Sequence, residues 1–415
     1  MKRIYIVFTS ILLLLSCDNE ELIQEDVINN LDFNTEKTRR TSNDLYASNQ
    51  MVIQYDASLT EAEKQAMRNQ YNVVSFKKCE CADPTLELWI FAKNTGKGGN
   101  PTIEEKVLGV KEDTDIEGVD FNRYISQTGQ GLLTSFGTPD MNTARQKIVS
   151  RNENVTIAVL DTGIDYNYFG FTNPFLYKNE NSCSDSEFRD YYGWDFVNQD
   201  NDPFDDHGHG TIVSNLMYTK LTAQNVSFQI LPVKVFNEFG RGNYFDILCG
   251  FQYAVNNRDV AIINMSFGWY HSNYEILNKL VLENQNRVLI TASAGNKGIN
   301  TDFNVHYPST YESNNILSVA SLYRNMMYPN LASFSNLGNI TVDIAARGED
   351  IPFYLSADEY ISVSGTSFSN AYATALCGKM YTPQMSVEQL MSAVITNTIP
   401  HDNLSTIKYG SYIPY

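Results

Sequence analysis

The sequence has few cationic residues for its length. Its 415 residues include 30 Lys and Arg against 48 Asp and Glu, which gives a formal net charge of −18 at pH 7. A protein that binds nucleic acid needs a basic face for the phosphates. The charge balance therefore argues against a nucleic-acid partner, and it favours solubility over electrostatic attachment to anionic lipid.

Cysteines are also few. Apart from Cys17, the chain has five, and an odd number in an exported protein leaves at least one without a partner in the chain. The first two of these, Cys79 and Cys81, are too close for an ordinary bridge, and no neighbouring His or Cys suggests zinc. Cys249 and Cys377 lie in apolar, helix-like contexts and are predicted to be buried thiols. The sequence thus predicts a fold that does not depend on a disulfide framework. The fifth is Cys183.

The N-terminal apolar run is too short to span a membrane comfortably. Residues 4–15 are apolar and follow Lys2 and Arg3, which is typical of a secretory signal. The run ends in Leu-Leu-Ser-Cys17, which resembles a bacterial lipobox, whose cysteine is lipidated and becomes the mature N-terminus. Each buried CH₂ of the acyl chains would contribute about 0.8 kcal/mol to anchoring. An ordinary cleaved signal with a chance cysteine is the alternative.

The resemblance implies a protein of the cell envelope, lipid-anchored to a bacterial membrane. The acidic run at residues 18–21 resembles signals that send lipoproteins of some Gram-negative bacteria to the cell surface. The outer membrane and the cell surface are therefore the expected location.

Three distant motifs supply residue types that nucleophilic hydrolysis needs. Asp161 follows an apolar run at 155–160, His209 begins a His-Gly-Thr triplet, and Ser367 follows Gly-Thr. A serine hydroxyl attacks poorly until a neighbouring base takes its proton, and a carboxylate keeps that base in the correct tautomer. The chain has only five histidines, and His207 is the competitor for the base because it lies in the same loop.

In the order Asp, His, Ser, these motifs resemble those of the subtilisin-like serine proteases, or subtilases. Ser-Ala-Gly-Asn at 293–296 resembles the family's Ala-Ala-Gly-Asn, and 263–268 resembles the strand that pairs with substrate. Asp-Thr-Gly alone is weak, since aspartic proteases share it, but five motifs in order over residues 150–415 are specific.

The resemblance assigns a role to each residue. Ser367 is the nucleophile, His209 the base and Asp161 its orienting carboxylate, while Asn296 donates to the oxyanion. The expected substrate-binding residues form two facing walls: Ser266, Phe267 and Gly268 on one side, and Ser293, Ala294 and Gly295 on the other. Lys297 beside the second wall has two interpretations, an attraction for acidic side chains or an exposed, solvated lysine.

The chain departs from the family pattern at three positions. The second histidine that usually follows His-Gly-Thr is Ile212, and after Ser367 the usual Pro and His are Ala371 and Tyr372. None of them is the base or the nucleophile, so the departures bear on efficiency and pocket shape more than on the chemistry.

The expected fold class is α/β. Short Val- and Ile-rich runs at 155–160, 228–235, 261–265, 287–292 and 316–320 alternate with helical stretches, which predicts a parallel sheet with helices on both faces. Residues 49–127 show a βαββαβ pattern, typical of a ferredoxin-like domain and similar to the inhibitory propeptide of subtilases.

The predicted organisation has five parts. They are a lipoprotein signal peptide (1–17), a flexible tether (18–48), a propeptide inhibitor-like domain (49–127), a junction that contains the maturation bond (128–150) and a subtilisin-like peptidase domain (151–415).

No cofactor is required by the predicted chemistry. Aspartates 200, 202, 205 and 206 crowd one loop, which is compatible with a structural calcium site or with exposed turns. The expected partners are a polypeptide substrate, the chain's own propeptide as an intramolecular inhibitor, and a membrane through the lipid anchor.

The predicted function is a lipid-anchored, exported serine endopeptidase made as a zymogen. Two alternatives stay open. One is a non-catalytic surface lipoprotein that keeps the fold to bind peptides, and the other is a narrow peptidase that trims leader peptides.

Overall fold

The structure is a computed structural model that describes residues 38–41, 44–79, 82–93, 101–127, 131, 136–150, 155–178, 192–324 and 328–414. The lipobox at Cys17, most of the expected tether and the cysteines at 81 and 183 lie outside these residues. The last part of that tether is not irregular, because β1 (Thr38–Thr41) and the start of β2 (Asp44–Tyr55) fall within it. Among the described helices, none combines the length and apolar character needed to cross a bilayer.

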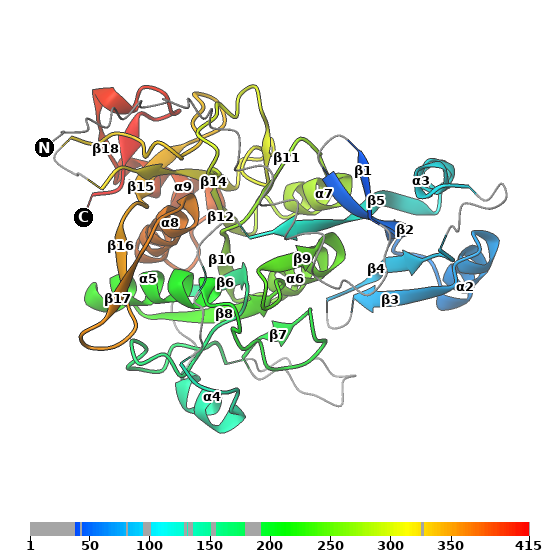
Figure 1. Ribbon diagram of the computed structural model, residues 1–415, viewed down its shortest axis with the longest axis horizontal. Coiled ribbons are helices and arrows are strands. Elements are labelled where there is room, and N and C mark those ends of the chain that lie inside the picture. Colours follow the sequence, from blue (N-terminus) through cyan, green and yellow to red (C-terminus); the bar gives the residue numbers. More distant parts are fainter. Residues whose placement is uncertain are drawn as a thin grey trace, which may run out of the picture. The chain divides into compact units, whose positions relative to one another are not determined.

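The centre of the molecule is the predicted parallel sheet (Figure 1). Its strand order is β18-β19-β15-β14-β12-β10-β6-β8-β7, and the pairs from β15 to β7 are all parallel. The strands are β6 (Val155–Asp161), β7 (Trp194–Asp195), β8 (Phe228–Lys234), β10 (Val260–Met265), β12 (Leu289–Ser293), β14 (Ile316–Leu322), β15 (Ile344–Arg347), β18 (Ile399–Pro400) and β19 (Ser411–Tyr412).

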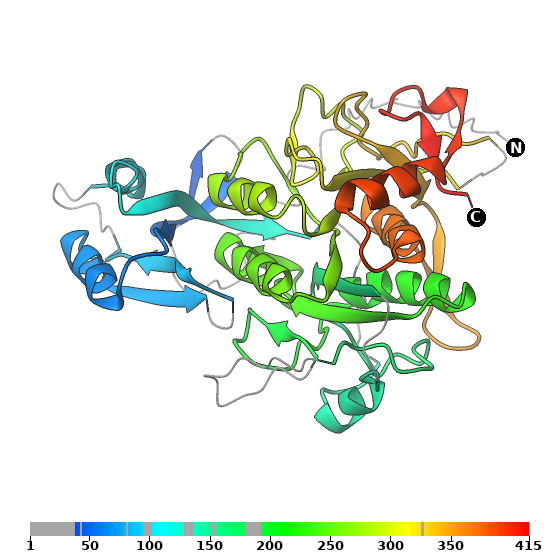
Figure 2. The ribbon, with the colours of Figure 1, turned by 180° about the vertical axis from the view of Figure 1, so that it is seen from behind.

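Helices cover both faces of this sheet, as Figures 1 and 2 show from opposite sides. Along β6, Ala158 and Leu160 pack with α6 (Tyr244–Asn256) and α7 (Glu275–Glu283), whereas Ile157 and Val159 pack with α5, α8 and α9. The last three helices span His209–Ala223, Thr366–Met380 and Val387–Thr396. Alternate residues of a strand point to opposite faces, so the apolar run of β6 is buried on both sides. The predicted α/β class is confirmed.

Strand β6 lies at the point where the strand order reverses. Its neighbour on one side is β8 and on the other is β10. In open α/β sheets, the loops that follow the strands on either side of such a point separate and leave a crevice at the carboxyl ends. Asp161, the last residue of β6, therefore stands at the floor of the expected site.

The N-terminal part has the predicted βαββαβ order. It comprises β2, α2 (Glu61–Gln70), β3 (Ser75–Cys79), β4 (Asp83–Ile90), α3 (Ile103–Val110) and β5 (Ile116–Ser126). The sheet order β3-β4-β2-β5 is that of a ferredoxin-like fold. Thr60 and Thr102 begin the two helices with capping boxes, which satisfy backbone N–H groups that have no intrahelical partner.

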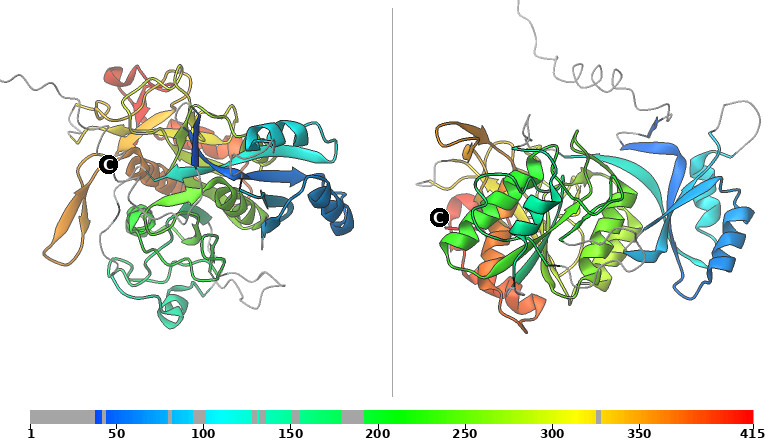
Figure 3. Two further views of the ribbon diagram at one scale, coloured as in Figure 1. Left: turned by 45° about the vertical axis from the view of Figure 1, so that its right-hand side comes forward. Right: turned by 90° about the horizontal axis from the view of Figure 1, so that it is seen from below.

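Neither face of this N-terminal sheet is left to solvent. Met51, Ile53 and Trp89 pack in one cluster with the apolar side chains of α2 and α3. Val52, Leu86 and Leu88 join the cluster that contains α6 and α7. The two views of Figure 3 show the N-terminal strands in blue and cyan beside these green helices. The sheet is thus shared between its own helices and those of the C-terminal part.

The remaining elements are short. They are α4 (Met141–Lys147), β9 (Arg241–Asn243), the antiparallel pair of β11 (Trp269–Tyr270) with β13 (His306–Tyr307), the hairpin of β16 (Ile351–Tyr354) with β17 (Tyr360–Val363), and a 3₁₀ turn at Asp402–Leu404.

The prediction for Cys249 is wrong. Cys249 forms a disulfide with Cys79, which is 170 residues away in the sequence. The apolar context of Cys249 did predict its burial but not its partner, because only the docking of the N-terminal sheet against α6, through β4 and β5, brings the two sulfurs together. Cys377 is a buried free thiol, as predicted.

A buried ion pair organises the N-terminal sheet. Glu87 accepts hydrogen bonds from the Arg68 guanidinium, the Tyr55 hydroxyl and the Trp89 indole N–H, and Arg68 and Glu87 are each 1% exposed. Arg68 also pairs with Glu61, whose side chain is 58% exposed.

Replacing Glu87 with Ala should destabilise this sheet strongly, because it leaves a buried guanidinium without its main counter-charge. The expected cost is about 3–5 kcal/mol, whereas Glu61→Ala, which removes the exposed partner of the same arginine, should cost at most about 1 kcal/mol. Hydrogen exchange of the β2 and β4 amides measures both in a Ser367→Ala background. Equal losses of protection for the two variants would contradict this ranking.

Candidate active site

Asp161 and His209 meet at the carboxyl end of β6. Asp161 ends the strand, and His209 is the first residue of α5. The His209 Nδ1 lies 2.8 Å from Asp161 Oδ1 and 3.0 Å from Oδ2, and both side chains are fully buried. A buried carboxylate at this nitrogen places the imidazole proton on Nδ1 and leaves Nε2 as the basic atom. That Nε2 is buried and has no hydrogen-bond partner in the described part of the chain.

The turn before α5 brings the imidazole to the carboxylate. Gly208 has φ of 97°, a left-handed conformation that favours glycine, and Gly210 packs so closely that a Cβ there would lie 2.2 Å from the Gly163 carbonyl oxygen. The His-Gly motif and Asp-Thr-Gly motif are therefore complementary: each needs small residues so that β6 and α5 can approach.

His207, the competing histidine, does not occupy the position of the base. Its ring centroid lies 6.5 Å from that of His209, and both Asp161 oxygens face His209. Burial, together with the neighbouring His209, lowers the pKa of His207. The two histidines are therefore close in the sequence, but their rings lie apart, and it is the His209 ring that contacts Asp161.

Ser367 lies beside this pair. It is the second residue of α8, 1% exposed, and its neighbour Phe368 has its ring centroid 5.6 Å from that of His209. The Ser367 hydroxyl donates to the Ser266 carbonyl oxygen at 2.9 Å. The hydroxyl is therefore turned toward the expected substrate-binding wall rather than toward His209.

Asn296 is held with its amide nitrogen toward the start of α8. Its Oδ1 accepts hydrogen bonds from the Thr366 backbone N–H at 2.9 Å and from the Thr366 hydroxyl at 2.8 Å. The Nδ2 atom is then on the side of Gly365, where a Cβ would lie 3.5 Å from it. The donor group consequently lies beside the residue that precedes Thr366 and Ser367.

The two expected substrate walls follow neighbouring strands. Residues 266–268 come after β10, residues 293–295 end β12 and the turn beyond it, and these strands are adjacent and parallel. Both walls contact the start of α8. The Ser367 hydroxyl donates to the Ser266 carbonyl oxygen, and the Gly295 N–H donates to the Thr366 hydroxyl at 3.2 Å. The structure therefore brings both walls to the start of α8. The ring of Phe267 is turned into the core, with its centroid 5.0 Å from that of Phe236, and Cys17 lies outside the described residues.

Asn336 is a contributor that sequence reasoning missed. Its Nδ2 donates to the Ala294 carbonyl, and its Oδ1 accepts from the Lys297 N–H, so one side chain holds both ends of the loop that carries Asn296. Its own segment has no motif, and only the tertiary contact reveals the role. The Lys297 ammonium lies 4.1 Å from the centroid of the Tyr270 ring.

The aspartates of the loop before His209 do not converge on a metal position. Asp205 accepts from Thr211 and Gly208, Asp206 pairs with Lys234, and Asp202 accepts from two tyrosines. Across the described ranges, no group of three or more His, Cys, Asp or Glu side chains could hold a metal ion. These carboxylates therefore do not fit a calcium site, and their partners are protein donors.

Asp205 organises the turn that positions His209. It is 1% exposed and accepts four hydrogen bonds, from the backbone N–H groups of His207, Gly208 and Thr211 and from the Thr211 hydroxyl. Burial alone would raise the pKa of Asp205, but the Lys234 ammonium and these hydrogen bonds outweigh it and hold the pKa below its ordinary value.

The comparisons with known proteins agree with this geometry. The profile of the subtilase family matches residues 152–411. The chain belongs to the subtilase family.

Individual relatives are more distant. This subtilase is 32% identical to the cell wall-associated protease of Bacillus subtilis over 54% of the chain and 23% of that protein, and 31% identical to the thermophilic serine proteinase of Bacillus sp. strain AK1 over 53% and 50%. It is 28% identical to thermitase of Thermoactinomyces vulgaris over 59% of the chain and 81% of thermitase. The chain thus spans half or less of the first two relatives.

A solved structure of a cold-adapted subtilisin-like serine proteinase matches with a TM-score of 0.50 and 22% identity. The match covers 65% of this chain and 89% of that one, and it supports the fold alone.

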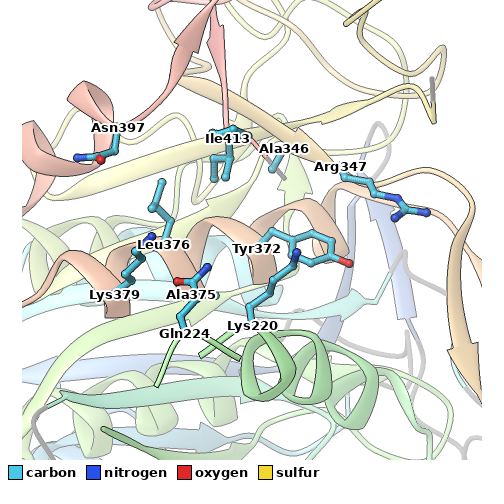
Figure 4. Close-up of a pocket in the computed structure, with 11 residues that line it drawn as sticks. Lys220, Gln224, Ala346, Arg347, Tyr372, Ala375, Leu376, Lys379, Asn397 and Ile413 are labelled. Atoms are coloured by element: carbon cyan, nitrogen blue, oxygen red, sulfur yellow. The ribbon is translucent and has the colours of Figure 1, made fainter. Parts of the chain in front are cut away.

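A separate pocket lies away from this site. It has a volume of about 140 Å³ and is lined by residues of α5, α8 and β15, among them Lys220, Tyr372 and Arg347 (Figure 4). Neither Ser367 nor His209 lines it. Tyr372, which replaces the family's usual histidine, therefore faces this pocket, where the Lys220 ammonium lies 5.4 Å from its ring centroid.

Asp205→Asn should lower stability because an amide cannot accept all four hydrogen bonds. The expected loss at pH 7 is about 2–5 kcal/mol, against less than about 1 kcal/mol for Asp200→Asn, a partly exposed aspartate of the same loop. Since the folded-state pKa of Asp205 lies below its ordinary value of 3.8, the wild-type advantage is complete above that value and shrinks as the pH falls through the folded-state pKa. Urea unfolding of the two variants from pH 7 to pH 3 measures it, and a gap that stays constant with pH would exclude this account.

Proposed function

We propose that this subtilase is a serine endopeptidase that cleaves polypeptides through Asp161, His209 and Ser367. The observation that carries the proposal is the buried contact of His209 Nδ1 with both Asp161 oxygens, with Nε2 left without a partner among the described residues. The His209 ring centroid lies 5.6 Å from that of Phe368, the residue after Ser367. The Asp161 contact occupies Nδ1 and leaves Nε2 open, which is the arrangement that a general base needs in order to accept a proton.

The first chemical step begins with a side-chain rotation. The Ser367 hydroxyl leaves the Ser266 carbonyl and turns toward His209 Nε2 as substrate takes its place. His209 then accepts the hydroxyl proton while Oγ attacks the scissile carbonyl, and Asp161 stabilises the imidazolium. The imidazolium returns the proton to the leaving amine, and water cleaves the acyl-enzyme by the same route.

The oxyanion is held by donors that are already in place. The Thr366 N–H and hydroxyl fix the Asn296 carbonyl oxygen, so its amide nitrogen lies on the side of Gly365, from where it would donate to the oxygen of the attacked carbonyl group. The N-terminus of α8 adds the Ser367 backbone N–H and its partial positive charge. A single preorganised donor of this kind contributes about 2.7–4 kcal/mol to the transition state.

The end of β5 and Gln127 indicate how an extended substrate would bind. Strand β5 pairs antiparallel with β9, and directly after it the Gln127 N–H donates to the Gly240 carbonyl at 2.7 Å. The Gln127 side chain reaches to 3.4 Å from Asp161 Oδ1. An extended peptide that adds to β9 is therefore led into the site, which is the β-augmentation mode.

We infer from the same contacts that residues 49–127 act as an inhibitory propeptide. Asp120 of β5 accepts hydrogen bonds from the Ile276 N–H at the start of α7 and from the Tyr244 hydroxyl of α6. Asn122 accepts from the Phe245 N–H. These contacts hold β5 against α6 and α7, and the maturation bond is expected shortly after Gln127, near the junction.

The proposal includes export and a lipid anchor on Cys17, with the cell surface as the expected location. It is supported by the basic residues, apolar run and lipobox-like motif at the N-terminus. The lipid would attach the enzyme to a membrane while the acidic catalytic part stays in solution.

Ser367→Ala should abolish peptide hydrolysis, labelling by a fluorophosphonate probe and the appearance of a shortened mature chain. Ser364→Ala, three residues earlier and outside the proposed machinery, should keep all three. Labelling, N-terminal sequencing of the mature chain and activity on casein measure these outcomes.

The two alternative functions give different results in the same experiment. The hydrogen bond of Ser367 to Ser266 favours a non-catalytic peptide binder, and a binder would give no labelling of the wild type even after the propeptide is removed. A narrow processing peptidase would be labelled but would leave casein intact and cut only a few members of a peptide library.

A further inference from the structure

The two substrate walls are not separated by an open slot, because the ring of His306 lies between them. A Cβ built on Gly268 would be 2.3 Å from His306 Cε1, and a Cβ built on Gly295 would be 2.9 Å from His306 Cδ2. The imidazole therefore touches the backbone of both walls at once. Gly268 and Gly295 leave just enough room for this ring.

The ring is fixed from three sides. His306 belongs to β13 and pairs with Tyr270 of β11, whose ring centroid is 4.7 Å from its own in an edge-on contact. Its Nδ1 lies 2.9 Å from the Ser309 hydroxyl, and the side chain is 3% exposed. Burial, with Lys297 nearby, lowers the pKa of His306 to about 3, so the ring is uncharged at neutral pH. A neutral, packed ring has no reason to leave for solvent.

We propose that His306 sets the specificity of this enzyme by filling the slot between residues 266–268 and 293–295, so that the residue on the amino side of the scissile bond must be Gly, Ala or Ser. This inference rests on the proposed function. A larger substrate side chain would overlap the imidazole, and a close-packed interior accommodates added volume only with strain.

The test compares fluorogenic peptides that differ only in the residue before the scissile bond. The wild type should cleave the Ala peptide at least 100-fold more efficiently in kcat/KM than the Phe peptide. His306→Gly should raise kcat/KM for the Phe peptide at least tenfold and change the Ala value only a few-fold. His271→Gly is the matched control, because His271 directly follows β11, the strand that pairs with β13, and has a φ of 74° that suits glycine.

The outcomes separate the two claims. A wild type that prefers Phe or Leu, or a His306→Gly enzyme with an unchanged Phe-to-Ala ratio, would overturn the role of His306 alone. Fluorophosphonate labelling of each variant shows that its site is still formed. Absence of both labelling and cleavage in every variant would instead overturn the proposed function and this inference with it.

A second, independent observation concerns the Cys79–Cys249 disulfide. Cys79 ends β3, on the N-terminal side of the junction, and Cys249 lies within α6, on its C-terminal side. Both are buried, at 4% and 1% exposed. The Gln252 amide beside this helix surface also donates to Asp83 at 2.8 Å, so the bridge lies within a formed interface.

We infer that the bridge keeps the propeptide attached after the junction is cut, so that release needs a dithiol reductant. A thiolate of the reductant attacks one sulfur and forms a mixed disulfide, and its second thiol then displaces the protein sulfur. Two protein thiols and one reductant disulfide result. Until then, the tethered propeptide stays at an effective concentration near the millimolar range and continues to occupy the site.

Two measurements test the tether. A site for an added specific protease is inserted after Gln127 in the Ser367→Ala chain, so that the cut does not depend on the proposed activity. Under denaturing, non-reducing conditions the cut chain should remain one species, and a dithiol should separate it into two. Separation without reductant, or mapping that pairs Cys249 with another cysteine, would overturn the tether.

The second measurement uses the self-processed enzyme. Activity of the wild type should not rise on dilution, whereas Cys79→Ser combined with Cys249→Ser should gain activity at least tenfold on dilution as its propeptide dissociates. A dilution response equal to that of the wild type would show that the bridge has no part in retention.

Discussion

The structure depends on one buried contact, that between Asp161 and His209. A fully buried carboxylate is costly unless hydrogen bonds compensate it, and here the Thr162 N–H and the imidazole do so. The contact is made only if the end of β6 and the first turn of α5 are both fixed to within a fraction of an ångström. Much of the surrounding sequence serves that requirement.

The loop before α5 shows how the position is fixed. Asp205 takes up backbone N–H groups that the helix start leaves without partners, and Lys234 offsets the charge that this brings into the interior. Lys234 also donates to the Thr162 carbonyl, which ties the same network back to the strand of Asp161. Two buried aspartates thus have different functions: one orients an imidazole, and the other shapes the turn that carries it.

Close packing of backbone segments also shapes the two expected substrate walls. The sheet places residues 266–268 and 293–295 at the carboxyl ends of two adjacent strands, and the His306 side chain of β13 lies between them. The N-terminal sheet docks on α6 and α7 and brings β5 to β9, so the end of this strand lies near Asp161 through Gln127. The Asp161–His209 pair and the slot are consequences of how the loops leave the parallel sheet, whereas the position of β5 follows from this docking.

Much of the fold was predictable from local sequence. The apolar runs of β6 and β8 and the capping residues Thr60 and Thr102 define elements through short-range physics, so the α/β class and the βαββαβ order followed. The site motifs were equally clear, because Asp161, His209 and Ser367 carry neighbours that identify them.

What remained depended on contacts between distant segments. The start of β2 at Asp44 was missed because nothing local marks it, and the partner of Cys249 was missed because 170 residues separate the two cysteines. Asn336 and His306 have no motif either, and their roles come from the loops they touch. The sequence by itself determined the family and the reactive residue types, because these depend on the identity of the residues in short motifs. Only the tertiary structure decided how much space lies between the two substrate walls, because that space depends on how distant backbone segments pack.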